Sequence, residues 1–130
     1  MDHKKLQVIE KIAKDVYRSL GSGYSEEVYD KAMQVGLRME GIKYENQKVV
    51  ELIYKGHHVG EGYPDLVVHF GKERVVVELK AVGSVLGAPE EQQLRNYLKL
   101  MGVSLGVLIN FQQPGKKEGE TGLEVKSVGV

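Results

Sequence analysis

The sequence predicts an α/β protein in which a mixed β-sheet is flanked by helices. Apolar residues recur every three or four positions within residues 6–39, which is typical of amphipathic helices. Short β-rich runs punctuated by glycine follow. A helical segment then separates two apolar runs, and such a crossover makes the strands on either side of it parallel. Because 130 residues allow one sizeable hydrophobic core but not two, we expect a single domain over residues 1–130.

Two helices are expected at the start of the chain. The first spans residues 6–20 and ends at a glycine-rich break. The second begins after Ser25 as its N-cap, carries Glu26 in its first turn, where an acid suits the helix dipole, and stops at Gly41. Four residues at helical spacing are expected to form its buried face: Val28, Ala32, Val35 and Met39.

The middle of the chain is expected to form three strands. Its β-rich runs are joined by short turns that contain glycine, and they predict an antiparallel meander with strands at residues 49–54, 65–70 and 74–82. The loop within residues 56–61 matches no functional pattern.

The last part of the chain is expected to add a helix and two strands. Pro89 suits the first turn of a helix that ends at Gly102. The apolar run at residues 105–111 predicts a buried strand, parallel to the strand before the helix. Residues 112–122 are polar and rich in glycine, which predicts a loop, and the weak alternation of residues 123–128 predicts an edge strand.

Composition excludes several kinds of site. The chain has no cysteine, so it has no disulfide, thiolate metal site or cysteine nucleophile. Acidic and basic residues number 18 each, so nucleic-acid binding would depend on a local patch rather than on bulk charge. Because no signal-like N-terminus and no apolar run long enough to span a bilayer occur, we expect a cytoplasmic protein without membrane contact.

An acid and a base lie two positions apart in the apolar run at residues 74–82. Glu78 and Lys80 project from one face of the expected strand and Leu79 from the other. Asp65 opens the preceding antiparallel strand, so we expect it near Glu78. Two carboxylates suit Mg²⁺ or Mn²⁺, and an adjacent ammonium can orient water or stabilise charge on a phosphate. A simple cross-strand ion pair explains the same residues, and both interpretations stay open.

Several short motifs of the chain resemble those of one known superfamily. Gly62-Tyr63-Pro64-Asp65 followed by Glu78-Leu79-Lys80 resembles the signature of the PD-(D/E)XK, or restriction-endonuclease-like, nucleases. Residues 23–29 fit the Gly-x-x-Glu-x-x-Tyr pattern of the GxxExxY protein family, and residues 93–97 resemble the Gln-x-x-x-Tyr motif of RecB-like nucleases. The expected order of elements is similar to their αβββαβ core, and the resemblance extends from the first helix to Phe111.

The resemblance implies a metal-dependent nuclease that hydrolyses phosphodiester bonds. Asp65 and Glu78 would bind Mg²⁺ or Mn²⁺ with the backbone carbonyl of Leu79, Lys80 would support the attacking water, and Glu26 would be a further catalytic acid and candidate metal ligand. Three residues are implied to bind substrate or support the site: Tyr29, Gln93 and Tyr97. The substrate would be nucleic acid, with DNA the expected type. Because cutting both strands of a duplex takes two sites, we expect a homodimer.

Simpler roles remain open for the same residues. Glu26 can stabilise the N-terminus of its helix through the dipole alone. Tyr29 and Tyr97 can be aromatic residues at the edge of the core whose hydroxyls reach water. Two alternative functions follow: a catalytically silent module that binds nucleic acid or protein, and a structural domain held by a Glu78–Lys80 ion pair.

Overall fold

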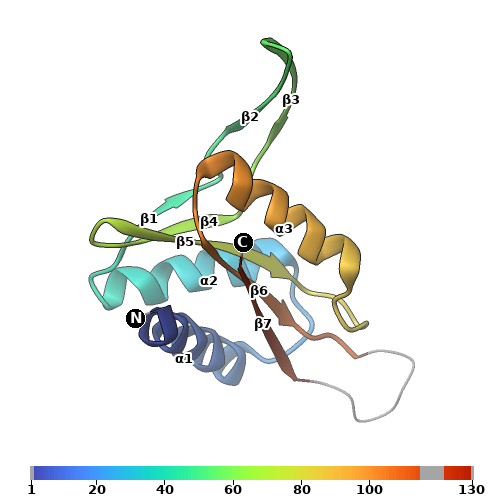
Figure 1. Ribbon diagram of the computed structural model, residues 1–130. Coiled ribbons are helices and arrows are strands. Elements are labelled where there is room, and N and C mark those ends of the chain that lie inside the picture. Colours follow the sequence, from blue (N-terminus) through green and yellow to red (C-terminus); the bar gives the residue numbers. More distant parts are fainter. Residues whose placement is uncertain (1, 115–121, 130) are drawn as a thin grey trace.

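The computed structural model describes residues 2–114 and 122–129 (Figure 1). The expected loop at residues 112–122 thus lies mostly outside the described residues. The elements follow one another in this order: α1 (Asp2–Leu20), α2 (Glu26–Met39), β1 (Lys43–Asn46), β2 (Val50–Tyr54), β3 (His57–Gly62), β4 (Leu66–Phe70), β5 (Glu73–Lys80), α3 (Ala88–Met101), β6 (Leu105–Phe111) and β7 (Leu123–Gly129).

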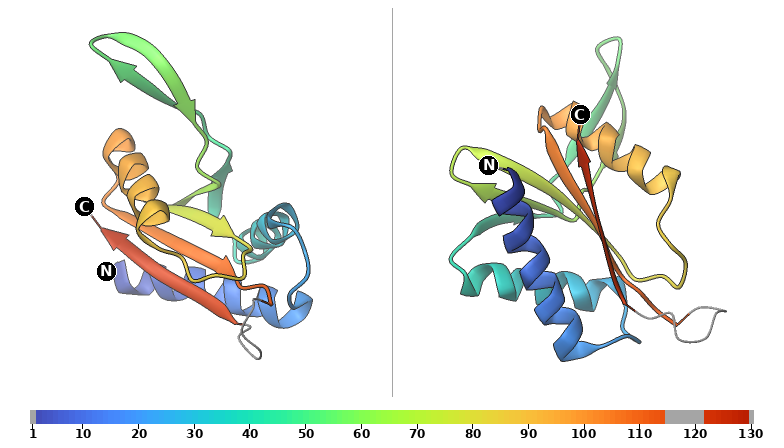
Figure 2. Two further views of the ribbon diagram at one scale, coloured as in Figure 1. Left: turned by 90° about the vertical axis from the view of Figure 1, so that its right-hand side faces the viewer. Right: turned by 60° about the horizontal axis from the view of Figure 1, so that its bottom comes forward.

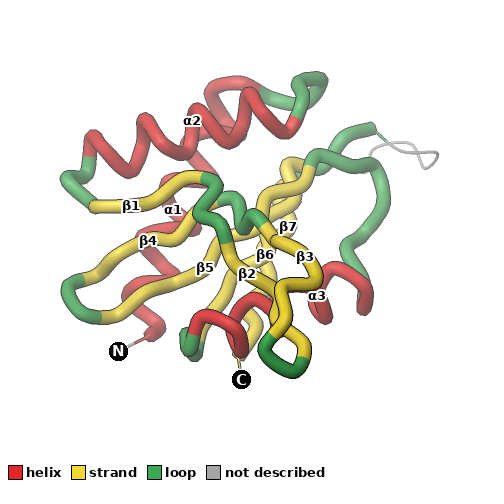
Figure 3. Tube along the Cα trace, turned by 90° about the horizontal axis from the view of Figure 1, so that it is seen from above, coloured by secondary structure: helices red, strands yellow, loops and turns green. Residues whose placement is uncertain are grey.

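Five strands form the main sheet, in the order β1-β4-β5-β6-β7. The β5–β6 pair is parallel and the other three pairs are antiparallel. The sheet is therefore mixed, as the sequence predicts, and α3 makes the crossover between its parallel strands. Helices α1 and α2 cover one face and α3 covers the other (Figure 2). Seen from above, α2 and α3 lie on opposite sides of the strands (Figure 3).

Strand β5 divides its side chains between two cores. Val75, Val77 and Leu79 pack in the core beneath α1 and α2, whereas Val76 packs in the smaller core beneath α3. Alternation along the strand then places Glu78 on the α3 face. A strand buried on both faces shows a nearly continuous apolar run, which is why this segment is so rich in valine.

The predicted antiparallel meander of three strands is wrong in its first strand. Residues 49–54 do not enter the main sheet, because β2 pairs with β3 in a separate two-stranded sheet. Lys55 and Gly56 both have positive φ, 48° and 80°, as in tight hairpin turns that pair a strand with the residues directly after it. This hairpin projects from the body of the protein (Figures 1 and 2). The place next to β4 is taken by the short strand β1.

The predicted buried face of α2 is also wrong, by one residue. Val28, Val35 and Met39 are 38, 46 and 84% exposed and Ala32 is half-buried, whereas the fully buried residues are Tyr29, Met33 and Leu37. Both sets have the same helical spacing, so periodicity alone does not separate them.

Two contacts set the orientation of α2. The Tyr29 ring stacks on Phe111 of β6, with 4.4 Å between ring centroids. Gly36 meets α1 so closely that a Cβ there would lie 2.5 Å from Ile12 Cγ2. These contacts turn Tyr29 toward the sheet and Gly36 toward α1.

Helix α3 matches its predicted boundaries. It begins at Ala88 with Pro89 in its first turn, and it ends before Gly102, which has the left-handed conformation common at helix C-termini (φ 66°). Within the described residues, each helix is too polar or too short to cross a membrane.

Candidate active site

Asp65 and Glu78 face each other across the β4–β5 pair. Leu66 pairs with Val77, which places Asp65, one residue before β4, opposite Glu78. The Asp65 backbone N–H donates to Glu78 Oε1 at 2.9 Å, and the Leu79 backbone N–H donates to Asp65 Oδ2 at 2.7 Å. The Glu78 carboxylate is thus bonded to the backbone of Asp65, and the Asp65 carboxylate is bonded to the backbone of β5 next to Glu78. These two bonds fix the side chains relative to one another.

Burial gives this carboxylate pair unusual acid–base properties. Glu78 is only 6% exposed, and burial, followed by the charge of Asp65, raises its pKa to about 8. Burial also raises the pKa of half-buried Asp65, although the hydrogen bond from Leu79 N–H opposes that shift. A bound cation would stabilise both ionised carboxylates, so the pair is electrostatically suited to a metal ion.

Lys80 lies two residues beyond Glu78 at the end of β5 and is half-buried. Its positive charge lowers the pKa of both Asp65 and Glu78, but less than burial raises them. In the part of the chain that the structure describes, its ammonium makes no ion pair with either carboxylate within 4 Å. The simple salt bridge that the sequence left open is therefore not formed.

A hollow of about 220 Å³ opens beside Asp65 on the α2 side. Its lining is acidic and comes from the start of α2, the end of β1 and the β4–β5 pair: Glu26, Glu27, Asp30, Gln47, Asp65 and Leu79. Glu26 and Asp30 lie one helical turn apart, and their charges contribute to the raised pKa of Asp65. The structure thus places Glu26 in the same hollow as Asp65.

Tyr29 lies away from this hollow. It is fully buried and its hydroxyl donates to the backbone carbonyl of Gly21 at 2.7 Å. The same hydroxyl accepts a hydrogen bond from Gln113 Nε2 at 3.2 Å. With its ring stacked on Phe111, Tyr29 joins α2 to the end of β6 and acts as a core residue.

Tyr97 approaches the carboxylate pair from α3. Its ring covers Gly62 so closely that a Cβ on Gly62 would lie 2.5 Å from Tyr97 Cε1. Its hydroxyl accepts hydrogen bonds from the Tyr63 backbone N–H and the Gln93 side chain. Burial and then the charge of Glu78 raise the pKa of Tyr97. Tyr97 therefore meets the segment that leads into Asp65, whereas Gln93 contacts the Tyr97 hydroxyl and is itself exposed.

Comparison with protein families matches residues 3–121 to the PD-(D/E)XK nuclease superfamily. The chain belongs to this superfamily. The finer resemblance to the GxxExxY family stays a prediction. In a search of solved structures, the chain resembles the crystal structure of SSO0001, with a TM-score of 0.58 and 17% sequence identity over 80% of this chain and 50% of that chain. No curated protein matches the chain.

The likeness to SSO0001 concerns the fold, and this chain spans half the length of that protein. The five-stranded mixed sheet flanked by helices agrees with the restriction-endonuclease-like fold that the sequence predicts. The two segments whose sequence resembles the superfamily signature, Gly62 to Asp65 and Glu78 to Lys80, lie side by side and are joined by hydrogen bonds.

PD-(D/E)XK nucleases typically use divalent metal ions, and the donors of this chain fit one. Asp65 and Glu78 would supply carboxylate oxygens and Leu79 a backbone carbonyl, and oxygen atoms of these kinds are the hard ligands that Mg²⁺ and Mn²⁺ prefer. Among residues 2–114 and 122–129, no three histidine or acidic side chains are already grouped to hold an ion. A site of two carboxylates and a carbonyl is consistent with that finding, because Mg²⁺ commonly takes its other ligands from water and phosphate.

Two residues near the PD-(D/E)XK signature were missed by the sequence interpretation. Asn46 Nδ2 donates to the Asp65 backbone carbonyl at 2.9 Å and to Asp30 Oδ1 at 3.1 Å. Gln47 Nε2 donates to Asp65 Oδ1 at 3.3 Å. The only sequence signal was the polar Asn-Gln pair at the end of a short, polar strand, and asparagine is common where a strand leads into a turn.

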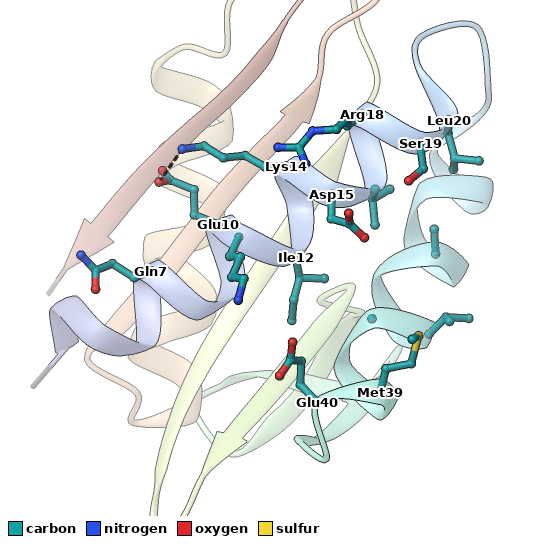
Figure 4. A pocket seen from close by; sticks show the side chains of 15 residues that line it. Gln7, Glu10, Ile12, Lys14, Asp15, Arg18, Ser19, Leu20, Met39 and Glu40 are labelled. Carbon is teal, nitrogen blue, oxygen red and sulfur yellow. Dashed lines mark ion pairs between the residues drawn. The ribbon is translucent and has the colours of Figure 1, made fainter.

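A larger hollow, with a volume of about 700 Å³, lies elsewhere, between α1 and α2 (Figure 4). Ile12 and Met39 contribute apolar side chains to it, and Glu10 and Lys14, which form an ion pair, also line it. None of the residues that the sequence predicts for the nuclease site lines this hollow. It therefore takes no part in the candidate active site.

Proposed function

We propose that this protein is a metal-dependent nuclease that hydrolyses the phosphodiester bonds of nucleic acids, with DNA the expected substrate. The observation that supports it most is the pairing of Asp65 and Glu78 through backbone hydrogen bonds of 2.9 and 2.7 Å, beside Lys80 on the same strand. Membership of the PD-(D/E)XK nuclease superfamily supports it independently.

In this proposal each residue has a defined role. Asp65 and Glu78, with the Leu79 carbonyl, would hold Mg²⁺ or Mn²⁺, which would supply a bound water of lowered pKa and neutralise phosphate charge. Lys80 orients the attacking water and stabilises the negative charge that develops on the phosphate. Glu26, across the 220 Å³ hollow from these residues, is the further acid of the site.

Two residues on the α3 side support the site without entering the chemistry. Tyr97 covers Gly62 and is hydrogen-bonded to the Tyr63 backbone. It therefore fixes the position of the segment that directly precedes Asp65. Gln93 donates to the Tyr97 hydroxyl and is exposed, where it can contact substrate.

Tyr29 supports α2, the helix that carries Glu26, by stacking on Phe111.

Cleavage assays test the proposal. Wild type, Asp65→Ala and the exposed-site control Glu51→Ala are incubated with Mn²⁺ and with single-stranded, duplex and branched DNA and with RNA. We expect wild type and Glu51→Ala to cleave at least one substrate and Asp65→Ala to cleave none. Wild-type protein that leaves every substrate as intact as Asp65→Ala does would refute the proposed activity.

A binding module without cleavage is the second candidate, because acidic and basic residues balance at 18 each and bulk charge does not favour a nucleic-acid substrate. Calorimetric titration separates the two functions. A nuclease site predicts Mn²⁺ binding that Asp65→Asn abolishes, since a metal ligand is lost. A silent module predicts salt-sensitive nucleic-acid binding that is the same with and without Mn²⁺.

We also propose that the active form is a homodimer, because one catalytic site per chain cuts one strand at a time. Size-exclusion chromatography with light scattering tests this at micromolar concentration. A dimer mass is expected, and a strictly monomeric protein that still cuts both strands of a duplex contradicts it.

A further inference from the structure

Gln47 has a left-handed backbone conformation although it lies outside the hairpin turns. It lies between β1 and β2 with φ 56°, in the left-handed region. The structure describes one other non-glycine residue with positive φ, Lys55, whose conformation belongs to the hairpin turn before Gly56. Gln47 joins strands of two different sheets, so no hairpin turn explains it. For a residue with a side chain, the left-handed backbone conformation costs about 1–2 kcal/mol relative to the right-handed one.

Packing of the Gln47 side chain does not offset the steric cost of its left-handed backbone. Gln47 is exposed, so its side chain adds little apolar burial. Glycine adopts the left-handed conformation without steric cost, and stability alone would favour it at this position. A strained residue that persists without a packing reason indicates a role at a site.

The contacts of Gln47 converge on one residue, Asp65. Its backbone N–H donates to the Asp65 backbone carbonyl at 3.1 Å, and its side-chain Nε2 donates to Asp65 Oδ1 at 3.3 Å. The other carboxylate oxygen, Oδ2, accepts from Leu79 N–H at 2.7 Å. Each oxygen of the carboxylate therefore has one donor that sets its direction, and because each has two lone pairs, each keeps one for a further partner.

The chemistry of the amide suits this place. Gln47 is the uncharged polar side chain in a hollow otherwise lined by four acids and Leu79. A lysine here would form an ion pair with Asp65 and compete with a cation for its oxygens, and an acid would add repulsion. An amide orients the carboxylate by a neutral hydrogen bond and leaves its charge available.

We propose that Gln47 is a positioning residue that holds the Asp65 carboxylate in the orientation needed to bind the divalent cation. This inference rests on the proposed function. Hydrogen bonds to metal-ligating carboxylates typically change metal affinity 10–100-fold when they are removed. On this proposal, the left-handed backbone at Gln47 serves to orient the Asp65 carboxylate and does not contribute to the stability of the fold.

The test compares two glycine substitutions in the full chain. Gln47→Gly keeps the backbone N–H that bonds the Asp65 carbonyl and removes only the side-chain donor. Lys55→Gly is the matched control, because it makes the same change at the other left-handed position, in the hairpin turn. Mn²⁺ affinity is measured by calorimetry, and stability without metal is measured by urea unfolding.

We expect both variants to be at least as stable as wild type, because glycine relieves the left-handed strain. Only Gln47→Gly should bind Mn²⁺ about tenfold more weakly. An Mn²⁺ Kd for Gln47→Gly within twofold of wild type overturns the positioning role and leaves the nuclease proposal intact. Wild-type protein that binds no Mn²⁺ overturns both, so the two failures are distinguishable.

Discussion

Replacing Glu78 with glutamine should stabilise the metal-free protein at neutral pH and leave its stability unchanged at acidic pH. Glu78 is 6% exposed and its pKa in the folded protein is about 8, against 4.5 for the free side chain. Between these values the folded protein keeps the Glu78 proton while the unfolded chain releases it. The stabilisation is therefore fully present below pH 4.5 and is lost as the pH rises toward 8.

The size of the effect follows from the same two pKa values. While only the folded state holds the proton, the free energy of unfolding falls by about 1.4 kcal/mol per pH unit. From pH 4.5 to pH 7 the loss is on the order of 3 kcal/mol. Glutamine at position 78 cannot ionise, yet its amide oxygen can still accept the hydrogen bond from the Asp65 backbone N–H.

Urea unfolding followed by circular dichroism, in EDTA at pH 5, 6, 7 and 8, measures the difference between wild type and Glu78→Gln. We expect that difference to grow steadily with pH. Glu51→Gln, a change of the same kind at an exposed position, is the control and should follow wild type. Stability curves of wild type and Glu78→Gln that run parallel between pH 5 and pH 7.5 would refute the reasoning. Added Mn²⁺ should restore wild-type stability at pH 7, because a bound cation stabilises the ionised carboxylate.

Three further predictions concern the site and the core. Lys80→Met should reduce the rate of cleavage about 100-fold or more while calorimetry still detects Mn²⁺ binding, and unchanged cleavage rates argue against its proposed role. Gly62→Ala should lower the free energy of unfolding by about 1–3 kcal/mol, because the new Cβ would meet the Tyr97 ring at 2.5 Å, and wild-type urea resistance contradicts that contact. Met33→Ala should cost about 2–5 kcal/mol in urea unfolding, whereas Met39→Ala, at an 84% exposed position, should change stability by less than about 0.5 kcal/mol. Equal costs at the two methionines would contradict the observed orientation of α2.

The central part of the fold was predictable because strong local patterns agree there. The apolar run of β5 and the short turn at Gly71 fix the register that sets Asp65 opposite Glu78. Pro89 and Gly102 mark the ends of α3, and the apolar strand after it requires a parallel pair.

The remaining features depend on contacts between distant segments. The buried face of α2 is set by Phe111 and Ile12, and neither is visible in the periodicity of the helix itself. Strand β1 is four residues long and its residues are exposed or half-buried, so it lacks the apolar alternation that identifies strands. The role inferred for Gln47 depends on a left-handed backbone and on Asp65, 18 positions away, which no local pattern reports.

The most direct test of the proposed metal site is anomalous diffraction from a crystal of this protein soaked in Mn²⁺. We predict a manganese peak between the carboxylates of Asp65 and Glu78, with the Leu79 carbonyl among its ligands. We further predict that crystals of Asp65→Asn, soaked in the same way, show no peak there. A fully soaked wild-type crystal without manganese at this position, or with manganese bound only elsewhere, would contradict the account.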